Sequence, residues 1–279
     1  MLDDQVFDAI AALAHRESGI KLLRGKKLMV QSRLRHRLRA LKLDDFTDYT
    51  THVLSADGAQ ERRFMISALT TNVSHFFREA QHFDVLSDAL LPLFRQKTAR
   101  GERIRIWSAG CSTGQEPYSI VMHLLSNEPS LEHADFRVLG TDIDPDVITS
   151  ARAGVYSKAQ LAGIPLEHRE RYVSPHGDTN GADVVSPTLR QVVSFQELNL
   201  LSRWPMRFPF DAIFCRNVVI YFDQQTQDRL WPRFNEALLP GGLLFLGHSE
   251  RVQNPSQYGF QSAGPTVYHK LGSPQRSVQ

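Results

Sequence analysis

Residues 104–118, with the sequence IRIWSAGCSTGQEPY, constrain the fold of this chain more than any other stretch. A short apolar run ends in a loop with glycines at Gly110 and Gly114, and an apolar pattern of helical spacing follows through Tyr118. A strand, a glycine-rich turn and a helix form the first unit of a doubly wound α/β fold, which binds ligands at the carboxyl ends of its strands. Glycine permits a positive φ angle and lets a ligand approach the backbone closely. We therefore expect an α/β domain with a ligand site at this loop.

A second predicted strand covers residues 136–143 (FRVLGTDI) and places Asp142 at its end. Folds of this kind use a carboxylate at that position to accept hydrogen bonds from a pair of ribose hydroxyls. The spacing of the two glycines, G-x-x-x-G, does not match the dinucleotide fingerprint G-x-G-x-x-G. The absent fingerprint argues against a nicotinamide-dependent dehydrogenase.

Length and composition indicate a globular protein without a membrane-spanning segment. A chain of 279 residues can form one large α/β domain and a smaller unit. No apolar run approaches the roughly 18 residues of a membrane span, and the acidic start MLDDQVFDAI is unlike a signal peptide. Cys111 and Cys215 are the only cysteines, so we expect neither a disulfide framework nor a zinc-ligand set. We predict a cytoplasmic protein without a bound metal.

Residues 1–70 have the apolar spacing of four helices, and the second, at about residues 26–41, is unusually basic. Nine cations and no acid occur between residues 18 and 43: Lys21, Arg24, Lys26, Lys27, Arg33, Arg35, Arg37, Arg39 and Lys42. An apolar stripe along this helix predicts that the cations spread over its exposed sides. They form either a solvated face or a docking surface for nucleic acid or an acidic protein. Charge alone does not choose between these partners.

The pattern along the chain predicts its domain organisation. The helical unit covers 1–70, a linker covers 71–79, and an α/β unit covers 80–271. The tail, 272–279 (GSPQRSVQ), should be disordered.

Residues 154–196 interrupt the alternation of strands and helices in the α/β unit. Short strands at 172–173, 183–186 and 191–195, separated by turn-rich sequence, predict a small antiparallel insertion. The α/β pattern then resumes with a buried strand at 210–215, a helix at 224–238 and strands at 243–247 and 267–270.

Six segments together resemble the chemotaxis receptor methyltransferases of the CheR family. They are TTNVSHFFRE (70–79), SAGCSTGQEPYS (108–119), GTDID (140–144), ELNLL (197–201), FDAIFCRNVVIYFD (210–223) and GHSE (247–250). CSTGQEPYS and CRNVVIYF are specific motifs that generic methyltransferases do not share. The resemblance implies a Rossmann-like S-adenosylmethionine-dependent methyltransferase domain with an N-terminal all-helical domain and a small antiparallel β insertion. It also implies methylation of glutamate side chains on the cytoplasmic helical bundle of bacterial chemoreceptors, in chemotactic adaptation, with S-adenosylhomocysteine as product.

The resemblance also implies which residues bind the cofactor. Asp142 would bind the ribose hydroxyls and Glu116 the charged amino-acid end. Asn199 and Leu200 would flank the adenine, and Cys215 and Arg216 would close the cofactor side at the end of a strand. Five of these six residues have a plainer structural interpretation: Asp142 as a turn cap, Glu116 as a first-turn acid favoured by the helix dipole, Cys215 as a core residue, and Asn199 and Leu200 as part of a loop.

Three further residues lie on the linker, which the family places across the cofactor as a lid: Asn72, Ser74 and Arg78. The guanidinium of Arg78 suits a carboxylate, so we expect Arg78 to touch both cofactor and substrate. Its alternative role is an interdomain salt bridge. Tyr221 would bring a hydroxyl near the reacting methyl group, and its alternative role is a core tyrosine.

Chemistry agrees with a carboxylate substrate. A glutamate side chain is already ionised at pH 7, so its attack on a sulfonium methyl needs no general base. Alignment and removal of water are then sufficient. The strand at 210–215 ends in Cys-Arg-Asn, not in the Asn/Asp-Pro-Pro-Tyr with which DNA methyltransferases hold an exocyclic amine.

Two other functional classes and one partner stay open. A nucleic-acid methyltransferase would use the basic helix, residues 26–42, on phosphates, although that helix lacks the interleaved aromatic residues of base-stacking surfaces. A non-catalytic sensor of S-adenosylmethionine is the other class. Our hypothesis is that the basic helix docks the chemoreceptor bundle, with no nucleic acid and no membrane insertion.

In some relatives the β insertion adds a peptide from the receptor's carboxyl terminus as an extra strand, and one sequence does not decide whether this chain does so.

Overall fold

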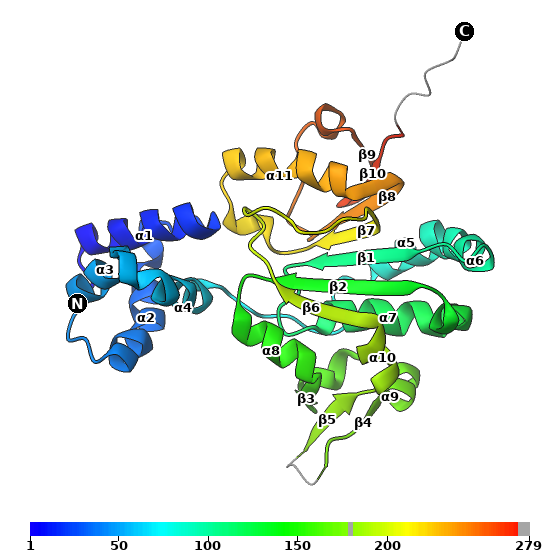
Figure 1. The fold of residues 1–279 in the computed structure, drawn as a ribbon, viewed down its shortest axis with the longest axis horizontal. Coiled ribbons are helices and arrows are strands. Elements are labelled where there is room, and N and C mark those ends of the chain that lie inside the picture. Colours follow the sequence, from blue (N-terminus) through cyan, green and yellow to red (C-terminus); the bar gives the residue numbers. More distant parts are fainter. Residues whose placement is uncertain (178–180, 273–279) are drawn as a thin grey trace.

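The computed structural model describes residues 1–177 and 181–272, and it shows a helical bundle beside a larger α/β unit (Figure 1). The bundle contains α1 (Asp4–Ser18), α2 (Lys27–Leu41), α3 (Phe46–Leu54) and α4 (Ala59–Leu69). Side chains cap two of these helices: Asp3 accepts from the backbone N–H of Val6, and Asp45 accepts from two N–H groups at the start of α3. The helices pack around their own apolar core, which includes Phe7, Ile10 and Val30.

The cations of the basic segment do not all lie on exposed sides, so this part of the prediction was wrong. Arg37 is only 17% exposed, and its guanidinium pairs in a bidentate way with Glu61, which is 4% exposed. Arg33 donates to the carbonyl oxygens of Leu69 and Thr70. The reason is that α4 brings an acid and its own unpaired carbonyl groups against α2, and buried polar groups of this kind require partners.

Other cations of the segment remain on the surface. Arg24 and Lys27 form ion pairs with acids of α1. Arg35, Arg39 and Lys42 are exposed, and none of them forms an ion pair within residues 1–177 and 181–272. Fewer than the nine cations of the segment are therefore free to meet a partner.

A seven-stranded sheet forms the centre of the α/β unit, with the order β6-β2-β1-β7-β8-β10-β9. The first five strands in this order are parallel, and β10 runs antiparallel to β8 and β9. The strands are β1 (Ile104–Ala109), β2 (Phe136–Asp142), β6 (Val193–Glu197), β7 (Phe210–Cys215), β8 (Leu238–Leu246), β9 (Phe260–Gly264) and β10 (Val267–Lys270). The helices are α5 (Gln81–Val85), α6 (Leu91–Ala99), α7 (Gln115–Asn127), α8 (Pro145–Ala153), α9 (Leu166–Tyr172), α10 (Pro187–Val192) and α11 (Gln224–Ala237).

Alternate residues of the central strands enter two separate cores. In β1, Ile106 packs with α5–α8 and α10 on one face, whereas Trp107 packs with α11 on the other. In β7, Phe214 and Cys215 divide in the same way. Because both faces are covered, these strands are apolar throughout, as expected for parallel strands.

The antiparallel insertion exists, but one of its predicted strands was wrong. The small sheet consists of β3 (Val155–Ser157), β5 (Ala182–Val185) and β4 (Val173–Pro175), with β5 in the middle. The third predicted strand, at 191–195, instead begins as α10 and continues as β6, a parallel edge strand of the main sheet. Burial of Val193 and Phe195 beside β2 explains this pairing, which no local sequence pattern encodes.

Two predictions concern the C-terminal tail and the division between the two units. The predicted tail lies outside the described residues beyond Gly272. The division at residues 70 and 79 stays a prediction, although the chain visibly passes from α4 into the α/β unit there as an extended segment (Figure 1). None of the helices in the described ranges is long and apolar enough to cross a membrane.

Candidate active site

A pocket lies at the carboxyl ends of β1, β2 and β7, between the sheet and the helical bundle. Ser18 and Ile20 reach the pocket from the end of α1, and the linker crosses it. The bundle is attached next to the pocket by a β-bridge between Ile20 and Phe222 and by a hydrogen bond from Lys21 N to Tyr221 O of 2.8 Å. Parts of the chain that are distant in sequence therefore build one pocket.

The loop after β1 requires its first glycine. Gly110 has a φ angle of 89°, and a Cβ there would lie 2.2 Å from Cγ2 of Val218. Ser112 also has a positive φ angle, 51°, and its backbone N–H donates to Oδ2 of Asp142 at 2.8 Å. The loop is thus held against the end of β2 through Asp142.

Asp142 is a pocket-lining carboxylate that is only 8% exposed. Besides Ser112, the backbone N–H of Asp144 donates to its other oxygen, Oδ1, at 3.1 Å. Burial raises the pKa of Asp142 to about 6, although these backbone donors act in the opposite direction. The group therefore changes charge in an accessible pH range.

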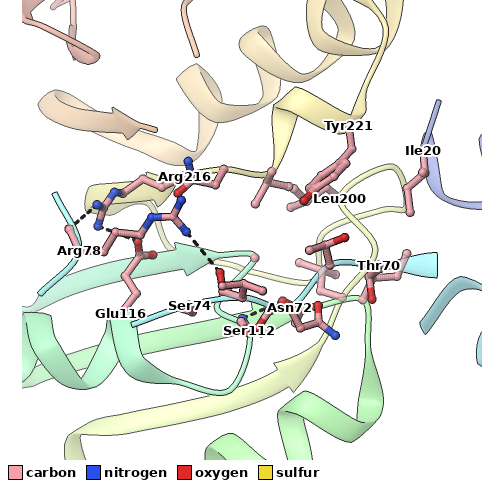
Figure 2. A pocket seen from close by; sticks show the side chains of 18 of the residues that line it. Ile20, Thr70, Asn72, Ser74, Arg78, Ser112, Glu116, Leu200, Arg216 and Tyr221 are labelled. Carbon is pink, nitrogen blue, oxygen red and sulfur yellow. Dashed lines mark hydrogen bonds and ion pairs between the residues drawn. The ribbon is translucent and has the colours of Figure 1, made fainter. Parts of the chain in front are cut away.

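The guanidinium of Arg216 is the centre of a buried ionic network at one end of the pocket (Figure 2). Arg216 is 2% exposed, and it lies 3.1 Å from Glu116 and 3.3 Å from Glu79. It also donates to the backbone oxygen of Arg78. Burial raises the pKa of Glu116 against the attraction of Arg216, whereas for Glu79 the attraction of Arg216 and the His248 N–H outweigh burial and lower the pKa. Arg216 thus neutralises the protein's own acids.

Arg78 lies beside this network but is not part of it. Its side chain lines the pocket and donates to Val73 O at 3.3 Å. Across residues 1–177 and 181–272, Arg78 forms no ion pair, so the interdomain salt bridge considered as its alternative is not present there. Figure 2 shows Arg78, Glu116 and Arg216 together at one end of the pocket and Ile20 and Thr70 at the other, and the Tyr221 side chain extends from the side of Leu200 into the pocket.

The other predicted residues lie around the same pocket, with one exception. Asn72, Ser74, Asn199, Leu200 and Tyr221 all line it. The side-chain amide of Asn72 donates to Asp144 at 2.6 Å, and that of Asn199 donates to the carbonyl of Glu17 at 2.6 Å. Both amides therefore hold parts of the pocket together.

Cys215 is the exception, because its side chain lies in the core on the α11 side of the sheet. It is fully buried, and this burial raises the pKa of its thiol. The side chain of Cys215 is therefore a core residue, as its structural interpretation predicted.

Sequence reasoning missed several residues of the site. Glu79 directly follows Arg78 and ends the linker motif TTNVSHFFRE. Its place beside a predicted site arginine is the signal that could have identified Glu79 as a site residue. Ser112 contributes a backbone N–H, which carries no side-chain signal. Ile143, Asn217 and Val218 also line the pocket. Sequence could not indicate this, because only the fold brings the ends of β2 and β7 together.

Comparison with known proteins places the chain in a family. Residues 72–268 match "CheR methyltransferase, SAM binding domain", and residues 5–70 match "CheR methyltransferase, all-alpha domain". The chain belongs to the CheR methyltransferase family. It therefore contains the S-adenosylmethionine-binding domain of a methyltransferase, and the resemblance inferred from its motifs is confirmed.

Relatives resemble the chain over almost its whole length. It is 43% identical over 258 residues to a "probable chemotaxis protein methyltransferase" of Rhizobium etli, covering 92% of this chain and 96% of the relative. It is 41% identical to "chemotaxis protein methyltransferase 2" of Pseudomonas aeruginosa, covering 94% and 91%. It is 40% identical to the "chemotaxis protein methyltransferase" of Escherichia coli, covering 96% and 91%.

The raised pKa of Asp142 predicts that binding of S-adenosylhomocysteine weakens in acid. If Asp142 binds the ribose hydroxyls, as the resemblance implies, only its carboxylate form can accept hydrogen bonds from both of them, and the fraction of that form falls as the pH drops below about 6. Between pH 7 and pH 5 the dissociation constant should rise about tenfold, as the binding-competent fraction falls. Isothermal titration calorimetry measures this change. Asp142→Asn is the control, since its affinity should be weaker and nearly constant over the same range; an unchanged pH dependence in this variant would assign the effect to another group.

Proposed function

We propose that this protein transfers the methyl group of S-adenosylmethionine to glutamate side-chain carboxylates of bacterial chemoreceptors. The methyltransferase family and its S-adenosylmethionine-binding domain support the reaction class. The names of relatives that are 40–43% identical over most of the chain support a role in chemotaxis. The finer assignment, to glutamate carboxylates, depends on the charge arrangement in the pocket.

The observation that carries this assignment is the contrast between the two arginines of the pocket. Arg216 is buried and occupied by Glu79 and Glu116. Arg78 also lines the pocket, yet its guanidinium has no acidic partner in the described parts of the chain. A cation with free donors beside a methyl-donor site suits an anionic acceptor, and the planar guanidinium matches a carboxylate. An amine acceptor would be repelled there.

The pocket also suits the three chemical parts of the cofactor. We assign Asp142 to the ribose hydroxyls, Glu116 to the charged amino-acid end, and Asn199 and Leu200 to the surroundings of the adenine. All four residues line the pocket, and Glu116 lies at its charged end, away from Leu200, which agrees with such a molecule (Figure 2). Asn72 and Ser74 belong to the lid over it. Cys215 contributes through packing, because its side chain is in the core.

When bound, S-adenosylmethionine supplies a methyl group activated by a sulfonium centre. The residues of this chain then have to orient the acceptor and exclude water, since the acceptor is already ionised. Arg78 would hold the acceptor carboxylate, and Tyr221 would place its hydroxyl near the reacting methyl group. The bundle residues Ser18 and Ile20 and the linker cover the pocket and limit the entry of water.

The helical bundle offers a docking surface for an acidic receptor. Arg35, Arg39 and Lys42 are exposed on α2 and at its end, on the same bundle that covers the pocket. Attraction between these charges and an acidic helical bundle would steer the encounter. The small sheet has a free edge on β3 and on β4 in the described part of the chain, and either could add a receptor peptide as a strand.

A methyl-transfer assay tests the proposed function. The protein is incubated with methyl-labelled S-adenosylmethionine and either a cytoplasmic receptor fragment or RNA. We expect label on the receptor fragment only, and we expect mild base to release it, because carboxyl methyl esters are base-labile and N-methyl groups are not. Arg78→Ala should lower kcat/KM for the receptor at least about tenfold, the size of one charged hydrogen bond. Base-stable label, or label on RNA, would overturn the proposal.

The docking role of the basic surface has its own test. Arg35→Glu combined with Arg39→Glu should raise the KM for receptor at least about fivefold, and added salt should weaken wild-type activity by screening the attraction. Affinity for S-adenosylhomocysteine should not change, since neither arginine lines the pocket. The matched control is Arg100→Glu with Arg207→Glu, an equal charge change before β1 and β7, at the amino ends of the strands. Equal KM values for the two double variants would make the α2 surface a solvated face.

A further inference from the structure

Glu250 is a buried carboxylate outside the pocket, in the GHSE segment that follows β8. It is 3% exposed, and it forms no ion pair within residues 1–177 and 181–272. A buried carboxylate without a cation is costly unless hydrogen bonds satisfy it. Three backbone N–H groups do so: Gly247 at 2.6 Å and Asn217 at 2.8 Å donate to Oε2, and Ile220 at 3.1 Å donates to Oε1.

Two of these donors, the N–H groups of Asn217 and Ile220, belong to residues 216–221. This segment follows β7 and also contains Arg216 and Tyr221. Asn217 has a positive φ angle of 59°, which is unfavourable for a residue other than glycine unless its surroundings hold it. Residues 219–221 form one short helical turn, whose first N–H groups have no partner inside the turn. Glu250 accepts from this segment near its start, at Asn217, and near its end, at Ile220.

Gly247 explains how Glu250 can reach the segment. In the parallel pair of β7 and β8, Cys215 lies opposite Leu246, so residues 216–221 and 247–250 leave neighbouring strands at the same edge. A Cβ on Gly247 would lie 2.5 Å from Nδ2 and 2.8 Å from N of Asn217. Only glycine allows this approach without displacing the segment. The GHSE segment therefore has a physical role that pocket lining does not reveal.

We propose that Glu250 is a positioning residue, whose carboxylate fixes residues 216–221 so that Tyr221 stands at the reacting methyl group. The inference rests on the proposed function, because it takes Tyr221 as the residue at the methyl group. The backbone oxygen of Tyr221 also accepts from the backbone N–H of Lys21 in the helical unit. Both Glu250 and the helical unit thus hold the segment, and loss of the Glu250 contact removes one of these two attachments.

Glu250→Gln tests this role with little change of volume. The Gln amide has only one acceptor oxygen. If this oxygen keeps the hydrogen bonds from the N–H groups of Gly247 and Asn217, the NH₂ group faces the N–H of Ile220, next to Tyr221, and that hydrogen bond is lost. We expect kcat for receptor methylation to fall at least about tenfold, the rate equivalent of one main-chain hydrogen bond, with the affinity for S-adenosylhomocysteine changed by less than about threefold. In a Tyr221→Phe background the same substitution should lower kcat by less than about twofold, because the group it positions is already gone.

Two further variants separate positioning from stability. Gly247→Ala keeps the carboxylate but displaces the segment, and it should show the same loss of kcat. Asp211→Asn is the control: Asp211 is also a buried carboxylate that accepts from a backbone N–H, that of Arg105 at 2.8 Å, it pairs in addition with Lys97, and it lies at the other end of β7. This control should lower the melting temperature and leave kcat within about twofold. A Glu250→Gln variant with lower stability and unchanged kcat, or an equal loss of kcat with and without Tyr221, would overturn the proposal.

Hydrogen–deuterium exchange supplies a readout that needs no methyl acceptor. In Glu250→Gln, the amides of residues 216–221 should exchange faster than in the wild type, while those around Asp211 should not change. Unchanged exchange at 216–221 would overturn the positioning role by itself. Faster exchange, in a protein whose wild type transfers no methyl group to receptor glutamates, would support the contact and contradict the proposed function.

Discussion

The arrangement of the whole site depends on the buried guanidinium of Arg216. A cation that is 2% exposed has to be neutralised, and here Glu116 of α7 and Glu79 of the linker do so together. Arg216 also binds the backbone oxygen of Arg78. One side chain from the end of β7 therefore attaches the linker to the sheet, and within residues 1–177 and 181–272 the Arg78 guanidinium is left without an acidic partner of its own. The contrast between an occupied and a free arginine follows from this single network.

Backbone conformations that are unfavourable elsewhere gather around the same pocket. Phe77, Glu79, Ser112 and Asn217 all have positive φ angles between 51° and 59°, although none is glycine. Each is held by a specific contact; the N–H of Phe77, for example, donates to the hydroxyl of Ser119 at 2.9 Å. Such conformations persist only where the surroundings enforce them, and they are frequent at functional sites. The stability of the two cores allows the loops between them to adopt this geometry.

Most of the fold could be predicted from local patterns, whereas the contacts that build the site could not. Apolar spacing identified the four helices of the bundle, and the glycine loop with Asp142 identified the ligand edge of the sheet. Local patterns did not show that 191–195 belongs to the main sheet, because an edge strand is defined by its neighbour β2. They also did not show that Arg37 is buried, since its partner Glu61 lies on another helix. Pairings of this kind join residues that are distant in sequence.

We propose that Arg216 neutralises the protein's own acids and leaves Arg78 for the acceptor carboxylate. A crystal structure of the complex with S-adenosylhomocysteine tests this division of roles. We expect Arg216 to stay between Glu79 and Glu116, Asp142 to accept from both ribose hydroxyls, and the Arg78 guanidinium to have donors directed at the position of the missing methyl group. A structure in which Arg216 leaves Glu116 to bind the homocysteine carboxylate, with Arg78 turned to solvent, would contradict it.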